Sequence, residues 1–218
     1  MEKPSDWADE TEQRLLDAAL KHVGALGWTR RAAEAAGRDL GLSPAEVELL
    51  LPNGGADLAA LLARRHDARA LERLAGVNPL DLKIRERIRA AVEARLDAAM
   101  ADESVLRRWG GFLALPQNLP LAGRLLWASA DVLWRWAGDV ATDENHYSKR
   151  AILAGILAAT TAIRLSSGRA AALAHLDARI ENVMAFDKWK AGLKPSDALR
   201  ELVEALGRMR YGRKADAA

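Results

Sequence analysis

Apolar residues recur every three or four positions along most of this chain, which is the spacing that places them on one side of an α-helix. The alternating runs of β-branched and aromatic residues that would predict strands are missing from the sequence. Glycine and proline interrupt the helical pattern at intervals. The predicted helices span residues 6–26, 29–40, 43–51, 57–75, 82–100, 103–115, 121–138, 147–165, 169–189 and 196–211. The sequence therefore predicts an all-α protein.

The first three predicted helices carry clear start and stop signals. Gly27 and Gly41 follow the first two helices, and Ser43, Pro44 and Glu46 form a capping box with proline at the first helical position. Helix, glycine turn and short helix outline a helix-turn-helix. This beginning, followed by longer helices, resembles the TetR-type regulator fold, which implies an N-terminal three-helix unit and a larger helical domain for ligand binding and dimerisation.

A DNA-binding role needs hydrogen-bond donors on the third helix to reach phosphates and base edges. Residues 42–51 contain no Lys, Arg, Asn, Gln or Thr, and Glu46 and Glu48 would face a polyanion. We therefore interpret the motif as architecture that has lost its DNA function. A ligand-responsive transcriptional regulator is the alternative, and the basic residues that keep it open are Arg30, Arg31 and Arg38.

These patterns predict three parts of the chain. Residues 1–55 form the degenerate helix-turn-helix-like unit, residues 56–192 a helical ligand-binding domain, and residues 193–218 an amphipathic basic helix and tail. Two stripes are assigned in the second part. An apolar stripe predicted to be core comprises Ile84, Ile88, Val92 and Leu96, and a basic stripe predicted to be solvated comprises Arg64, Arg65, Arg69 and Arg73.

The polar corner between residues 137 and 147 joins two unusual helices. The helix after it carries no charge over residues 151–163, so we expect it to be apolar on nearly all sides and buried in the middle of the domain. In the helix before it, Trp127, Asp131 and Trp134 share one face. The corner carries more specific chemistry than a helix connection requires.

Asp131 has two interpretations. Two tryptophans on its face indicate partial burial, which would raise the pKa of a carboxyl group that lacks partners. The simpler interpretation, which we prefer, is a structural partner for Lys149 or Arg150.

Composition adds few constraints on function. Half of the residues are hydrophobic, the net charge is +2 and cysteine is absent, which fits a globular protein from a reducing compartment. The uncharged runs end at about 14 residues, whereas about 20 are needed to cross a bilayer. The acidic first ten residues resemble no targeting peptide. We therefore expect a cytoplasmic protein, peripheral on the inner face of a bacterial membrane if it meets one.

No sequence motif supports catalysis or metal binding. The chain lacks a phosphate-binding lysine loop, a dinucleotide-binding glycine motif and a nucleophile elbow. Among its four histidines only His146 has a carboxylate, Asp143, at helical ligand spacing, and that pair falls at the corner. We expect no enzyme activity, no cofactor and no metal.

Apolar residues on both sides of the corner could line a hydrophobic tunnel or fill a core, and periodicity does not distinguish the two. The candidate lining residues are Leu121, Leu125, Trp127, Leu133, Trp134, Ile152, Leu153, Ile156 and Leu157. The last predicted helix has an apolar side suited to a membrane surface, to its own domain or to a second copy of the chain. Its candidate membrane-binding residues are Leu199, Leu202, Val203, Leu206 and Met209.

Residues 133–156, LWRWAGDVATDENHYSKRAILAGI, closely resemble a segment of the ubiquinone-biosynthesis accessory family known as the ninth Coq protein. The positions that match its pattern are Trp134, Ala137, Gly138, Asp139, Thr142, Asp143, Asn145, Tyr147, Ser148, Lys149, Arg150, Ala151 and Leu153. The resemblance also covers the LP-x4-LL stretch at residues 119–126, the RIENVMAF segment at 179–186 and the PNGGADL loop at 52–58.

This resemblance implies a TetR-like fold that is no longer a regulator, a buried site for isoprenoid lipid and a last helix that contacts membrane. It also implies a non-catalytic role, in which a quinone intermediate is delivered to the di-iron demethoxyubiquinone hydroxylase. The implied partner-binding residues at the corner are Asp143, Asn145, His146, Tyr147, Lys149 and Arg150. His146 departs from the family pattern, which usually has tryptophan there. A homodimer is common for this fold.

Overall fold

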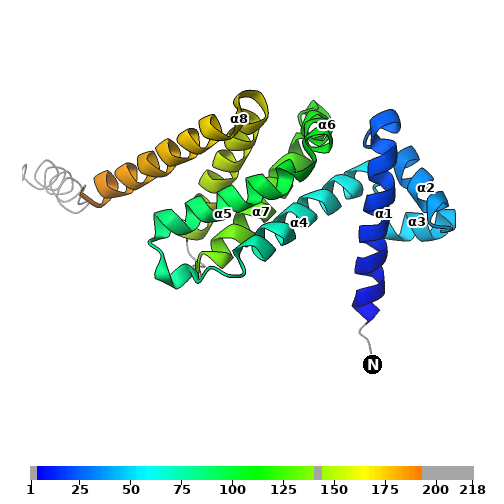
Figure 1. The fold of residues 1–218 in the computed structure, drawn as a ribbon, viewed down its shortest axis with the longest axis horizontal. Helices are drawn as coiled ribbons and strands as arrows, with labels where there is room; N and C mark the ends of the chain where they lie inside the picture. The colour runs from blue at the N-terminus through cyan, green and yellow to red at the C-terminus, as the bar shows by residue number, and fades with distance from the viewer. Residues whose placement is uncertain (1–3, 140–143, 193–218) are drawn as a thin grey trace, which may run out of the picture. The chain divides into compact units, whose positions relative to one another are not determined.

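The computed structural model describes residues 4–139 and 144–192, and within these ranges it contains helices and no strand (Figure 1). The α-helices are α1 (Pro4–Leu26), α2 (Arg30–Asp39), α3 (Pro44–Leu50), α4 (Gly55–Leu74), α5 (Ile84–Ala99), α6 (Glu103–Leu113), α7 (Leu119–Trp136) and α8 (Glu144–Gly192). Short 3-10 helices occur at Pro79–Asp81, Met100–Asp102 and Pro116–Asn118. The prediction of an all-α protein is confirmed, and the likeness to the TetR-type fold stays a prediction.

Two compact units divide the chain, Met1–Leu176 and Asp177–Ala218. The first unit contains α1 to α7 and most of α8. The described part of the second unit, residues 177–192, is the end of α8. The predicted amphipathic helix with Leu199, Leu202, Val203, Leu206 and Met209 lies outside the described residues.

Local side chains start the short helices where the sequence predicts. The Thr29 hydroxyl accepts a hydrogen bond from the Ala32 amide at the start of α2. At α3, the Ser43 hydroxyl accepts from the Glu46 amide, and the Glu46 carboxylate accepts from the Ser43 amide at 2.8 Å. This reciprocal capping box satisfies two amides that have no partner within the helix. The predicted starts of the second and third helices are therefore confirmed, and the three-helix unit itself stays a prediction.

A hydrophobic core of the first unit joins α1, α2, α3, α4 and α6. Leu15, Leu58 and Leu106 belong to it and are almost wholly buried. Leu121 and Leu125 of α7 pack half-buried against this core. One end of the predicted lipid-lining set therefore contacts the N-terminal helices.

A buried polar contact joins α4, α5 and α7. Arg95 donates to Asp67 at 2.5 Å, and the Ser129 hydroxyl donates to the other carboxylate oxygen of Asp67 at 2.9 Å. All three side chains are buried. Because a buried charge is stable only when it is paired and hydrogen-bonded, this triad fixes how the three helices align.

Two assignments of the apolar and basic stripes need correction. In α5, Ile88, Val92 and Leu96 are buried as predicted, but Ile84 is 40% exposed, because it is the first residue of the helix. In α4, Arg65 is not part of a solvated face, since its guanidinium contacts α1.

The first part of α8 is buried on one side only, which corrects the prediction of a helix buried all round. Leu153, Ile156, Leu157 and Thr160 are buried. The outer residues Ala151, Ile152, Gly155, Ala158, Ala159 and Ala162 are exposed. Most of the outer residues are small, so little apolar surface meets water even though no charge is present. Composition alone could not reveal this distinction.

Gly168 interrupts α8, as the predicted break at residues 166–168 indicated. Its φ of 86° and ψ of −177° are not helical, and glycine adopts this region without the steric cost that other residues incur. Figure 1 shows the chain turning at this point. We call residues 144–167 the first arm of α8 and residues 169–192 the second arm.

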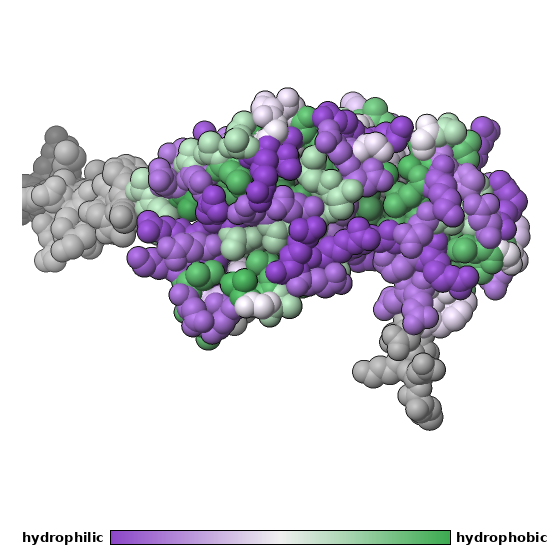
Figure 2. Space-filling view, in the orientation of Figure 1, coloured by the Kyte–Doolittle hydropathy of each residue, from purple (hydrophilic) through white to green (hydrophobic). Residues whose placement is uncertain are grey.

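Between His146 and Ala185, α8 contains a window long and apolar enough to span a membrane by length and composition alone. The break at Gly168 falls within this segment, and part of the window is buried in the protein. Figure 2 shows polar side chains over much of the visible face, with smaller apolar patches between them. Binding at a membrane surface stays a prediction.

Candidate functional site

The corner begins with a tight end to α7. The Gly138 amide donates to the Arg135 carbonyl, and the Asp139 amide donates to the Trp134 carbonyl, each at 3.0 Å. Gly138 has a φ of 87°, so these bonds form the turn in which glycine normally ends a helix. The turn directs the chain away from α7 and places Asp139 directly after it.

Arg150, in the first arm of α8, connects the two sides of the corner. Its Nε donates to Asp131 at 2.6 Å, and its Nη1 donates to Asp139 at 2.9 Å and to the His146 carbonyl at 3.2 Å. The residue is only 1% exposed. We call Arg150, Asp131 and Asp139 the arginine clamp. This buried cluster of ion pairs connects α8 to the end of α7.

A second set of contacts surrounds the arginine clamp. Lys149 pairs with Asp139 at 2.7 Å, and its Nζ lies 5.4 Å from the centre of the Trp134 ring. The Trp134 indole donates to the Lys149 carbonyl at 3.1 Å. The Trp127 ring lies 6.1 Å from the Tyr147 ring. The predicted face of α7 that carries the two tryptophans is therefore the face that meets α8.

Ionisation within the arginine clamp favours the charged forms. Burial raises the pKa of Asp131, but hydrogen bonds from Arg150 and Arg135 outweigh it and hold the pKa below its ordinary value. Burial also raises the pKa of Asp139, and hydrogen bonds from Lys149 and Arg150 again lower it further than burial raises it. The alternative of Asp131 as an acid with a raised pKa is therefore wrong. The preferred interpretation as an ion-pair partner is confirmed, with Arg150 as the partner.

The predicted partner-binding residues do not share one environment. Tyr147 is 64% exposed, and the half-buried His146 ring meets its edge at a centroid distance of 5.3 Å. Lys149 is half-buried, whereas Arg150 lies inside the protein. Asp143 and the Asn145 side chain lie outside the described residues. Of the described set, Tyr147, His146 and Lys149 reach the surface, whereas Arg150 does not.

The predicted lipid-lining residues occupy several environments. Leu133, Leu153, Ile156 and Leu157 are buried, and Leu121, Leu125, Trp127 and Trp134 are half-buried. Ile152 is 43% exposed and lies on the outer side of α8. The structure thus brings most of the set to the inner faces of α7 and α8 and leaves Ile152 outside.

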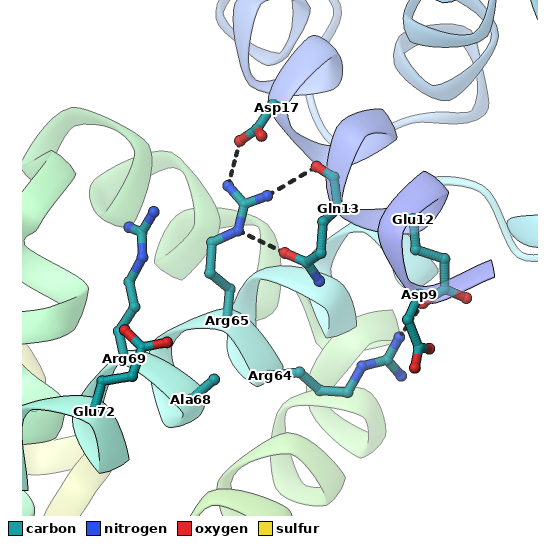
Figure 3. A pocket seen from close by; sticks show the side chains of 9 residues that line it. All are labelled: Asp9, Glu12, Gln13, Asp17, Arg64, Arg65, Ala68, Arg69 and Glu72. Carbon is teal, nitrogen blue, oxygen red and sulfur yellow. Dashed lines mark hydrogen bonds and ion pairs between the residues drawn. The ribbon is translucent and has the colours of Figure 1, made fainter. Parts of the chain in front are cut away.

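A polar pocket of about 580 Å³ lies between α1 and α4, away from these residues (Figure 3). Arg65 donates to Asp17 at 2.6 Å and to the Gln13 side chain at 2.9 Å, and Arg64 pairs with Glu12 at 2.8 Å. The full lining is Asp9, Glu12, Gln13, Asp17, Arg64, Arg65, Ala68, Arg69 and Glu72. These charges suit a hydrated groove rather than an isoprenoid tail. No local signal predicts it, because its partners are about fifty positions apart.

Metal chemistry has no support among the described residues, where no group of three His, Asp or Glu could hold an ion. His66 is buried beside Trp109, edge to face at 6.0 Å. Burial and the nearby charges of Arg95, Arg69 and Arg65 lower the pKa of His66 to about 2. This histidine is therefore neutral at physiological pH and belongs to the core.

The surface of α3 does not suit nucleic acid. Glu46 serves the capping box, and Arg30 of α2 pairs with Glu48 and donates to the Pro52 carbonyl. Leu49 is 76% exposed on the same helix. An acidic helix with an exposed leucine offers no donor to a base edge.

Together these features define an all-α protein in which a buried arginine ties two helices around a tryptophan-lined corner. The corner and most of α8 lie within residues 119–187, which match the family model COQ9. The chain belongs to the COQ9 family.

The chain is similar to proteins named ubiquinone biosynthesis protein COQ9, mitochondrial. It is 32% identical to the Xenopus tropicalis protein over 167 residues, which cover 72% of this chain and 51% of that relative. It is 31% identical to the Homo sapiens protein over 163 residues, which again cover 72% of this chain and 51% of that relative. The Bos taurus protein is 31% identical over 164 residues, with the same coverage. The chain spans about half the length of these relatives.

Asp139 is the site residue for which sequence reasoning assigned no role. Its position in the AGD triplet of the matching segment was the available signal. The structure gives Asp139 two cationic partners, Lys149 and Arg150, and so makes it the acidic centre of the corner.

Proposed function

We propose that this chain is a non-catalytic accessory protein of ubiquinone biosynthesis. It binds isoprenoid quinone intermediates at a membrane and presents them to the di-iron demethoxyubiquinone hydroxylase. The observation that carries the proposal is the match of residues 119–187 to the COQ9 family, because the same residues build the arginine clamp and the apolar faces beside it. The relatives are named for ubiquinone biosynthesis, which supplies the pathway.

The lipid-binding part of the proposal is supported by the inner faces of α7 and α8. Leu153, Ile156 and Leu157 make a continuous buried row at helical spacing, and Leu133 of α7 is fully buried. A polyprenyl tail is stable only where it is removed from water, and such a row offers it an apolar surface. In this proposal the tail packs along this row of side chains, either in place of the side chains that now cover it or next to them.

The presentation step is assigned to the outer surface of the corner. Tyr147 is exposed and its ring is held by contacts with His146 and Trp127. A fixed, exposed aromatic ring is a favourable anchor for a protein partner, since little side-chain entropy is lost on binding. Lys149, which pairs with Asp139, follows Tyr147 by two residues in the chain. Its charge would help to orient the partner protein.

Membrane contact and dimerisation complete the proposal. The basic, amphipathic residues 196–211 would hold the chain on a membrane surface, at the inner face of the cytoplasmic membrane in a bacterium. The exposed small residues of the first arm, including Gly155 and Ala159, would allow a second copy to approach closely.

A pull-down from native membranes separates this function from the alternatives. The full chain, added to membranes solubilised in mild detergent, is expected to recover the hydroxylase. A transcriptional regulator would instead retain duplex DNA in a salt-sensitive manner. Repeated recovery of DNA, or of neither partner, would reject presentation to the hydroxylase.

A further inference from the structure

Three buried polar groups of α8 lack hydrogen-bond partners in the structure. They are the Thr160 hydroxyl, the Arg164 Nε and the His175 Nε2. Thr160 is completely buried, and its hydroxyl leaves unused the carbonyl four residues earlier, which is the usual acceptor for a threonine inside a helix. Arg164 is half-buried and, among the described residues, has no ion pair. Buried donors without acceptors destabilise a fold, so their presence requires an explanation.

The first two groups continue the apolar row of the first arm. Leu153, Ile156 and Leu157 are followed at helical spacing by Thr160 and Arg164 on the same buried side. From Leu157 to Arg164 the helix rises by about 10 Å. The inner face of this arm is therefore apolar toward the corner and polar toward the bend. An amphiphilic molecule with one polar end matches this order.

The third group, His175, follows the break at Gly168. Thr160 precedes the break by eight residues and His175 follows it by seven, so both lie about 11 Å from it along their arms. His175 shares its side of the second arm with Leu176, which is fully buried.

Neighbouring helices fix both arms close to the bend. Arg107 of α6 donates to the Leu165 carbonyl at 2.6 Å, at the end of the first arm. Arg169, at the start of the second arm, pairs with Glu93 at 2.5 Å and with Asp97 at 3.0 Å on α5. Arg169 thus engages two carboxylates of α5, and no acceptor for the Arg164 Nε is found among the described residues.

We propose that Thr160, Arg164 and His175 bind the oxygen-bearing head group of a lipid whose isoprenoid tail lies along Leu153, Ile156 and Leu157. The assignment rests on the proposed lipid-binding function and deepens it. A quinone ring offers carbonyl and ether oxygens, which accept hydrogen bonds from a hydroxyl and a guanidinium N–H. The imidazole Nε2 donates or accepts according to its tautomer. The head group therefore lies near the bend and the tail points toward the corner.

A pair of matched probes tests the head-group assignment. Tryptophan fluorescence of the full chain is titrated with ubiquinone carrying two isoprene units and with geranylbenzene, which has the same tail but no ring oxygens. Arg164→Met should weaken ubiquinone binding by about tenfold, and Thr160→Val by about threefold, in keeping with the loss of single hydrogen bonds. Geranylbenzene binding should change less than about twofold in both. Arg31→Met, on the exposed side of α2, is the control and should bind both probes like the wild type.

Stability gives an independent measure of the same variants. Thr160→Val removes an unpaired buried hydroxyl, so the thermal midpoint of the ligand-free protein should stay or rise while quinone affinity falls. Arg164→Lys keeps the charge and should recover part of the affinity lost in Arg164→Met. A lower thermal midpoint in Thr160→Val would overturn the assignment, since the hydroxyl would then be needed by the fold.

The remaining outcomes distinguish a failure of the head-group assignment from a failure of the proposed lipid binding. Equal loss for both probes, or unchanged ubiquinone binding in Arg164→Met, would overturn the head-group assignment and leave lipid binding intact. A wild-type chain that binds neither probe would reject lipid binding itself. Inorganic phosphate is the third probe, and saturable phosphate binding that depends on Arg164 while quinone binding does not would assign these residues to an anion instead.

Discussion

Arg150 is the residue on which the corner depends. Arg150→Met removes the shared partner of two carboxylates and leaves, among the described residues, Arg135 as the cation of Asp131 and Lys149 as the cation of Asp139. We expect the free energy of unfolding to fall by about 3 kcal/mol, near the lower end for a broken buried pair, because each carboxylate keeps one cation. Chemical denaturation followed by circular dichroism measures the change.

The control for this prediction lies on the same carboxylate. Arg135 pairs with Asp131 at 2.7 Å, but its side chain is 72% exposed. Arg135→Met should therefore cost less than about 1 kcal/mol, as solvent screens an exposed pair. Equal losses in the two variants would show that burial of the arginine clamp contributes nothing to stability.

His146 and Tyr147 allow a test of the partner surface in both directions. Tyr147→Ala should lower the affinity for the hydroxylase about thirtyfold, the effect of removing an aromatic anchor worth about 2 kcal/mol. His146→Trp, which restores the aromatic residue of the family pattern, should raise it. Titration by surface plasmon resonance measures both, with Leu49→Ala on α3 as an exposed control. An unchanged affinity in both corner variants would count against the assignment of these residues to the partner surface.

At the level of single residues, the sequence predicted which side chains lie at the corner but not which cation pairs with which carboxylate. The face with Trp127, Asp131 and Trp134 was predictable because helical spacing is local. The choice between Lys149 and Arg150 for Asp131 was not, since it depends on where the turn at Gly138 places Asp139. Arg150 reaches both carboxylates, and Lys149 takes the second oxygen of Asp139.

Helix boundaries followed from local signals. Thr29 and Ser43 begin helices where predicted, and Gly168 breaks α8 within the predicted gap, because caps and glycine breaks act over a few residues. Burial was harder to predict. The uncharged stretch 151–163 is exposed along one side, and Arg65 binds α1 about fifty residues away. Both results depend on which helix faces which, and that information is not local.

The predicted last helix is best tested as a whole element. Deleting residues 196–218 removes an apolar side on which each residue contributes about 1.5 to 3 kcal/mol if it is buried in lipid. We expect the full chain to float with anionic liposomes and the truncated chain to stay in solution. Leu202→Asp in the full chain is the finer variant and should also reduce flotation. Equal flotation of all three proteins would reject membrane binding by this segment.

For the whole molecule, the fold class and the family were predictable from the sequence, and the position of any lipid was not. Periodicity gave the helices, and the segment at residues 133–156 gave the family. The sequence pattern of a buried row such as Leu153, Ile156 and Leu157 is the same whether the row belongs to a filled core or to a lipid-binding surface. The polar groups beside the bend became visible only when their lack of partners could be checked in space.

The central claim is that the chain carries an isoprenoid quinone, and the most direct measurement is solvent extraction of the purified full chain followed by mass spectrometry. The chain is prepared from cells that make ubiquinone and is washed free of detergent-bound lipid. We expect an isoprenoid quinone or one of its biosynthetic precursors in the extract, enriched over bulk phospholipid. Repeated preparations that contain only phospholipid, or no lipid, would contradict it.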